Sequence, residues 1–198
     1  MYREHLREMI QFVLKNYDLY SRDAEELLML TAACESNLGH YFKQLGNGPA
    51  LGIFQVEPAT YDWMQTKVMA KFDRCYKNLD ELCKKHGYEN GYVDYYSDDT
   101  YIADIRKSKE YTTWVKWKLI DDGVSSVLDT NNDRFDFMCD LEAQILSARL
   151  IYWFKTPKAI PSYKDVELLA RYWKRYWNSE LGAGTIDGVI EKYHKYVK

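Results

Sequence analysis

The sequence has few cysteines, and it lacks any long apolar run. Its four cysteines, Cys34, Cys75, Cys83 and Cys139, form no CxxC pair, so their spacing indicates neither a zinc site nor a disulfide framework. Cys34 and Cys139 lie in apolar surroundings and are interpreted as small core residues. The longest apolar stretch, around residues 27–34, is far too short to cross a bilayer. We therefore expect no membrane span.

A basic excess is also missing. The 198 residues include 27 Lys and Arg and 30 Asp and Glu, which gives a net charge of -3 and no basic run. Nucleic acid is therefore not an expected partner. None of the histidines has a metal-ligand spacing with another histidine or with a cysteine. We expect neither a metal nor another cofactor.

One segment, Asp129–Asp133, begins like a calcium-binding loop. Arg134 stands where such a loop needs glycine, and Asp140 stands where it needs glutamate. A polar loop that caps the next helix is therefore the preferred interpretation.

The first residues, Met1–Met9, are rich in charge and lack the apolar segment of a signal peptide. We expect synthesis in the cytoplasm without a signal peptide. If the substrate lies outside the membrane, another component must deliver the protein.

The remaining composition is typical of a folded globular chain, with 46% apolar and 29% charged residues. Apolar side chains recur at helical spacing in several segments, and Ser21 is placed to cap the second of them. The predicted helices cover about residues 2–17, 22–37, 58–72, 78–86, 137–154, 163–177 and 186–196. The sequence therefore predicts a mainly α fold.

Residues 88–133 differ in kind, since they combine a tyrosine cluster with many acids and short mixed segments. We interpret them as an irregular Tyr-rich insertion of unknown role, in which Tyr111–Leu119 could be strand-like. The expected organisation is one domain formed by residues 1–87 and 136–198, with an insertion at 88–135.

The most informative segments are Leu30–Gly39, LTAACESNLG, and Pro49–Pro58, PALGIFQVEP. Glu35 ends an apolar helix, where the helix dipole and burial both disfavour ionisation. A carboxyl that stays protonated near neutral pH can donate a proton to a glycosidic oxygen. The glycine-rich loop leaves room for a polymer, and Gln55 offers an amide suited to sugar hydroxyls. These residues predict a carbohydrate-cleaving site.

This combination resembles the soluble lytic transglycosylase family, particularly its phage members, and more distantly the goose-type lysozymes. The family pattern is a Glu-Ser pair that ends a helix and a Gly-x-x-Gln that follows after a short loop, here Gly52-Ile-Phe-Gln55. The resemblance extends over about residues 23–72 and 136–198, and it implies a lysozyme-like helical domain. By this resemblance Glu35 is the catalytic acid and base, Ser36 contacts the substrate or the acid, and Gln55 binds substrate.

The late tyrosine of the family is matched less directly. Tyr172 fits by spacing and is expected to hydrogen-bond Glu35, but Trp173 follows it where the family has asparagine. Tyr176 or the Trp177-Asn178 pair could fill this position instead. Asn178 is therefore also a candidate for substrate binding.

Most glycosidases use two carboxylates, but the stretch between Ser36 and Tyr61 contains no aspartate. Glu57 is its one carboxylate; it is a candidate substrate-binding residue or interacts with the N-terminus of the helix that begins at Pro58. A single-carboxylate route is therefore favoured. The resemblance then implies a lytic transglycosylase that cleaves the MurNAc-GlcNAc β-1,4 bond of peptidoglycan.

The alternatives are a hydrolytic muramidase on the same fold, a non-catalytic virion structural or binding protein, and an enzyme that cleaves chitin or chitosan. The resemblance implies either a phage endolysin that leaves the cell by a holin-type route or a lysin carried in a virion with other virion proteins.

Overall fold

The computed structural model of the protein describes residues 2–46, 48–86, 103–125, 137–156, 158–179 and 182–198. Most of these residues are helical, which confirms the prediction of a mainly α fold. The helices are α1 (Arg3–Asn16), α2 (Arg22–Ser36), α3 (Pro58–Lys85), α4 (Ala103–Arg106), α5 (Lys109–Ser125), α7 (Leu141–Lys155), α8 (Val166–Trp173), the π-helical η2 (Lys174–Asn178) and α9 (Ile186–Tyr196). None of these described helices is long and apolar enough to cross a membrane.

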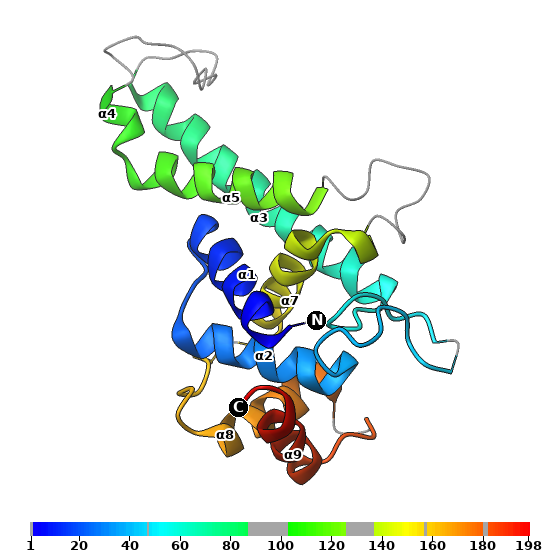
Figure 1. The fold of residues 1–198 in the computed structure, drawn as a ribbon. Coiled ribbons are helices and arrows are strands. Elements are labelled where there is room, and N and C mark those ends of the chain that lie inside the picture. The colour runs from blue at the N-terminus through cyan, green and yellow to red at the C-terminus, as the bar shows by residue number, and fades with distance from the viewer. Residues whose placement is uncertain (1, 47, 87–102, 126–136, 157, 180–181) are drawn as a thin grey trace.

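Helices α2 and α7 form the centre of the protein (Figure 1). Ser21 caps α2 as the sequence predicts, because its hydroxyl accepts a hydrogen bond of 3.0 Å from the Ala24 amide. Most side chains of α2 and of α7 are buried. The buried hydroxyls of Thr31 and Tyr152 join the two helices at 2.8 Å. Helices α1, α8 and α9 pack around this pair.

Helices α3 and α5 lie side by side and extend away from the rest of the protein (Figure 1). Helix α3 is one continuous helix of 28 residues, whereas the sequence predicts two shorter ones. Cys75, Leu79 and Cys83 continue the buried stripe of α3 past the expected break. We refer to α3 and α5 together as the hairpin.

The strand-like interpretation of Tyr111–Leu119 is wrong, because these residues belong to α5. Trp114, Trp117 and Ile120 are buried at helical spacing in the hydrophobic core. The tyrosine cluster of residues 88–101 and the calcium-like loop of residues 129–133 lie outside the described residues.

Two further predictions need correction. The helix expected at residues 163–177 is divided into α8 and η2, with wider π-helical turns at its end. Cys139 is exposed rather than a core residue, and Cys34 is half-buried. All four cysteines are free thiols.

A buried ionic cluster fixes the positions of α1, α2 and α9. The carboxylates of Glu25 and Glu26 are buried, and Arg7 of α1 lies 2.5 Å from the first and 2.6 Å from the second. Arg22 reaches the same two carboxylates at 2.8 Å and 3.0 Å. The Tyr193 hydroxyl of α9 donates to Glu26 at 3.1 Å. The cluster therefore ties α9 to the face of α2.

We expect Arg7→Met to lower the free energy of unfolding by about 3 kcal/mol, because two buried carboxylates would keep only Arg22 as an ionic partner. Chemical denaturation measures the change. The matched control is Arg171→Met, which removes the exposed pair with Glu167 and should cost about 0.5 kcal/mol or less. Equal effects of the two substitutions would contradict a stabilising role for the cluster.

Candidate functional site

Glu35 lies on the walls of two pockets. The larger, which we call the cleft, has a volume of about 410 Å³ and is bounded by the end of α2, the loop before α3, α7 and η2. Its lining includes Glu35, Gln55, Glu57, Lys155, Trp177 and Asn178. The second, the α9 pocket, has a volume of about 400 Å³ and shares Glu35 and Asn178 with the cleft. Trp173 and Lys192 also line the α9 pocket.

The surroundings of Glu35 favour its protonated form. Burial raises the pKa of this carboxyl from an ordinary value of 4.5 to about 7. The Lys192 ammonium and the indole groups of Trp173 and Trp177 lower this pKa, but their effect is smaller than that of burial. The buried Nε1 of Trp173 makes no hydrogen bond of good geometry with any described residue, and so it remains available to the carboxyl. A pKa near 7 suits a group that donates and then accepts a proton.

Lys192 is a residue that sequence reasoning missed. Its ammonium donates a hydrogen bond of 2.6 Å to the Cys34 carbonyl, in the last turn of α2, which holds the charge near Glu35. The sequence predicts the helix that carries Lys192, but its local pattern does not show which residue of α9 faces α2. The sequence shows only that the last helix carries a lysine, and many lysines that have no role in a site occur in the same way.

Two tyrosines lie near Glu35. Burial, and to a smaller extent the charge of Glu35, raises the pKa of Tyr41 in the loop after α2. Tyr152 of α7 is fully buried, and burial, with a smaller contribution from the Glu35 charge, raises its pKa well above the usual range, although its hydrogen bond with Thr31 lowers it. Neither residue was among the candidates from the sequence.

The loop before α3 places Gln55 on the cleft. Gln55 has a left-handed backbone with φ 50°, and its Nε2 donates to the Gly52 carbonyl at 2.6 Å. Its Oε1 is buried and has no hydrogen-bond partner among the described residues. A buried acceptor without a partner is costly, so this oxygen is available to a ligand that enters the cleft.

The backbone of Ile53 is held from both sides. The Ser36 hydroxyl donates to the Ile53 carbonyl at 2.6 Å, and the Ile53 amide donates to Gln144 Oε1 at 2.7 Å. Gln144 in turn donates to the carbonyls of Phe137 and Met138. Gly52, with φ 76°, leaves space for this contact, because a Cβ there would lie 2.4 Å from Gln144 Oε1. Helices α2 and α7 therefore determine the shape of the loop together.

The structure brings together four of the predicted site residues: Glu35, Gln55, Glu57 and Asn178 all line the cleft. Glu57 is exposed at the N-cap position of α3, and its side chain makes no capping hydrogen bond. The Asn178 side-chain oxygen accepts a hydrogen bond of 2.8 Å from Lys174.

Ser36 and Tyr172 do not line the cleft. The Ser36 hydroxyl is fully buried and occupied by its bonds to Ile53 and to the Gly39 amide, so it shapes the loop rather than facing a ligand. The Tyr172 hydroxyl donates to the Lys158 carbonyl at 3.3 Å, and the expected hydrogen bond to Glu35 is not formed.

The other residues considered for the late tyrosine position of the family, Tyr176 and the Trp177-Asn178 pair, lie in different surroundings. The Tyr176 ring packs on the Tyr172 ring with centroids 4.7 Å apart, whereas Trp177 and Asn178 line the cleft.

Within the parts of the chain that are described, no three His, Cys, Asp or Glu side chains are grouped as a metal site would require.

Comparison with known proteins finds no family model, no curated protein and no solved structure that matches this chain.

We expect Gly52→Ala to lower the free energy of unfolding by about 3 kcal/mol or more, because the new Cβ meets Gln144 and the left-handed backbone is strained. The matched control is Gly46→Ala, at φ 79° with nothing within 4 Å, which should cost only about 1 to 2 kcal/mol. Denaturation curves of both variants give the difference. If the two substitutions cost the same, Gln144 does not constrain the loop.

We also expect Glu35→Gln to remove part of the pH dependence of stability. The folded pKa of Glu35 is raised, so the folded state binds the proton more tightly, and stability is lost as the pH rises from about 4.5 to about 7. The loss is on the order of 3 kcal/mol, since one pKa unit corresponds to about 1.4 kcal/mol. The free energy of unfolding of Glu35→Gln, relative to that of the wild type, should therefore be higher at pH 8 than at pH 4.

Denaturation at these two values of pH measures the effect. The control is Glu57→Gln, which removes an exposed carboxylate from the same cleft. An identical pH dependence in the wild type and in Glu35→Gln would show that the Glu35 carboxyl is not desolvated.

Proposed function

We propose that this protein is a lytic transglycosylase that cleaves the MurNAc-GlcNAc β-1,4 bond of peptidoglycan, with Glu35 as its single catalytic acid and base. The observation that carries the proposal is the Glu35 carboxyl, which burial keeps protonated near neutral pH on the wall of a cleft that also contains the free amide oxygen of Gln55. The resemblance of the Glu35-Ser36 and Gly52-Ile-Phe-Gln55 segments to the soluble lytic transglycosylases supports the choice of substrate.

The proposed reaction needs one carboxyl group. Glu35 donates its proton to the glycosidic oxygen, and the bond from the muramic C1 to that oxygen breaks. The N-acetyl group of the substrate stabilises the positive charge that develops at C1. The Glu35 carboxylate then takes the proton from the muramic C6 hydroxyl, whose oxygen bonds to C1 and closes a 1,6-anhydro ring. Glu35 ends protonated, ready for another cycle.

The nearby residues have roles in this scheme that follow from their chemistry. Gln55 Oε1 would accept a hydrogen bond from a sugar hydroxyl or an N-acetyl amide, which would satisfy an oxygen that is buried without a partner. Lys192 stabilises the Glu35 carboxylate after the first proton transfer, because its ammonium lowers the pKa of that group. The Trp177 indole offers an apolar surface to a sugar ring.

One observation favours a second candidate, a hydrolytic muramidase. Glu57 lines the same cleft and its carboxylate makes no capping bond, so it is free to activate a water molecule. In that case Glu35 protonates the leaving group as before, and water rather than the C6 hydroxyl attacks C1. An endolysin and a virion-associated lysin are both compatible with either chemistry.

We expect Glu35→Gln to abolish the clearing of purified cell walls, since glutamine cannot donate the proton, while the circular dichroism spectrum stays unchanged. Wild-type activity should fall as the pH rises through about 7, because Glu35 then loses its proton. Cell-wall zymography and turbidity assays measure both effects. Full activity in Glu35→Gln would end the proposal, and inactivity of the wild type would favour a non-catalytic binding protein.

The products of wall digestion distinguish the transglycosylase reaction from hydrolysis. Mass spectrometry of the products should find 1,6-anhydro ends, and Glu57→Gln should keep most of the activity. Reducing ends, together with a loss of activity in Glu57→Gln, would instead identify a muramidase. A panel that includes chitin and chitosan tests the substrate class.

A further inference from the structure

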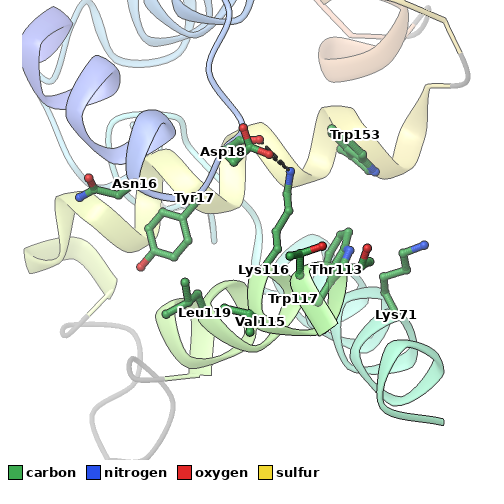
Figure 2. A pocket seen from close by; sticks show the side chains of 11 residues that line it. Asn16, Tyr17, Asp18, Lys71, Thr113, Val115, Lys116, Trp117, Leu119 and Trp153 are labelled. Atoms are coloured by element: carbon green, nitrogen blue, oxygen red, sulfur yellow. Dashed lines mark hydrogen bonds and ion pairs between the residues drawn. The ribbon is translucent and has the colours of Figure 1, made fainter. Parts of the chain in front are cut away.

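A third pocket lies between the hairpin and the core, away from Glu35. It has a volume of about 570 Å³, within the range of roughly 300–1,000 Å³ of ligand sites, and is lined by the end of α1, by α3, by α5 and by α7. Figure 2 shows that Lys116 of α5 extends across this pocket to Asp18, a contact of 2.8 Å. Trp153, Trp117 and Lys71 lie on one side of this ion pair, and Asn16 and Tyr17 lie on the other. We call this the hairpin pocket.

The hairpin pocket and the cleft use opposite faces of α7. Ile151 and Lys155 line the cleft, whereas Trp153 lines the hairpin pocket. Residues two apart on an α-helix point about 200° apart around its axis, since one turn holds about 3.6 residues. The two pockets have no lining residue in common. A ligand in the hairpin pocket would therefore leave the cleft open.

The chemistry of the hairpin pocket combines exposed aromatic surface with positive charge. Trp153 is 44% exposed although it belongs to a central helix. The Arg149 guanidinium lies 5.3 Å and the Lys116 ammonium 5.9 Å from the centroid of its ring. The Lys71 ammonium lies 5.7 Å from the centroid of Trp117.

The positive charge in this pocket is only partly compensated. Lys116 is paired with Asp18, whereas Lys71 has no ion pair within the described part of the chain. Thr113 and Asn16 add a hydroxyl and an amide to the lining. An exposed indole suits the apolar face of a sugar ring, a free ammonium suits an acidic substituent, and the remaining polar groups suit sugar hydroxyls.

We propose that the hairpin pocket is a second, non-catalytic binding site for an acidic glycan chain, with a sugar ring on Trp153 and its acidic group on Lys71. The choice of the peptidoglycan strand as the source of this chain rests on the proposed function. Peptidoglycan carries carboxylates on its peptide stems, and polymers attached to it carry phosphates, so both offer the acidic sugar chemistry required. Binding of the polymer at two separate sites raises the overall affinity for the wall, because the second contact forms at high effective concentration.

The test uses the full chain with Glu35→Gln, so that the wall is not digested, and measures co-sedimentation with purified cell walls. Lys71→Glu and Trp153→Ala are each expected to weaken binding about tenfold, and the Lys71 contribution should fall with added salt. The matched control for charge is Lys67→Glu, one turn earlier on α3, where the ammonium lies 6.0 Å from the Trp63 ring and outside the pocket lining. Phe12→Ala, which removes a 59% exposed ring from α1, is the control for lost apolar surface.

Walls from which the attached phosphate polymers have been removed identify the source of the acidic group. If Lys71→Glu and Trp153→Ala still bind these stripped walls more weakly than the parent protein does, the pocket binds the peptidoglycan strand. If the two variants bind more weakly only to untreated walls, the pocket binds the attached polymer. Unchanged binding to both by Lys71→Glu and Trp153→Ala, with all variants folded by circular dichroism, overturns the proposal.

Cleavage of short soluble glycan fragments separates this proposal from the proposed function. With Glu35 intact, Lys71→Glu should cleave such fragments at the wild-type rate while clearing whole walls more slowly. If the wild type cleaves neither substrate but Lys71→Glu still loses wall binding, the proposed function fails and the hairpin pocket remains a glycan site.

Discussion

The candidate site depends on the way the backbone of Ile53 is held between α2 and α7. Ser36 bonds its carbonyl and Gln144 bonds its amide, and both side chains are buried. Because the turn is fixed at this residue, Gly52 must approach Gln144 closely, and Gln55 must place its amide on the cleft with Glu35. The two central helices therefore hold both polar groups of one loop residue.

The electrostatics of the cleft follow from a competition at Glu35. Burial favours the neutral carboxyl, and the Lys192 ammonium with the indoles of Trp173 and Trp177 favours the charged one. Burial has the larger effect, so the pKa settles at about 7 rather than far above it. A carboxyl in this balance can exchange its proton in both directions, which is what a single acid and base needs. The ionic cluster that ties α9 to α2 is what keeps Lys192 in reach.

Helix α7 serves two surfaces at once. Its buried side chains form the centre of the fold, while Lys155 faces the cleft and Trp153 faces the hairpin pocket. Helix α5, which contributes Lys116 and Trp117 to the hairpin pocket, lies within residues 88–135, the insertion expected from the sequence. A glycan site on that side would add wall affinity without altering the residues around Glu35.

The sequence alone determined the features that depend on neighbours along the chain. Helical periodicity predicted residues 186–196 as a helix, the hydroxyl of Ser21 predicted a cap, and the order of Glu35, Gly52 and Gln55 predicted an acid and an amide near one loop. Only the tertiary structure decided which side chains meet. It assigned Ser36 to the loop rather than the cleft, directed Tyr172 to Lys158, and brought Lys192 to Glu35, because the rotation of each helix about its axis is set by what the whole core buries.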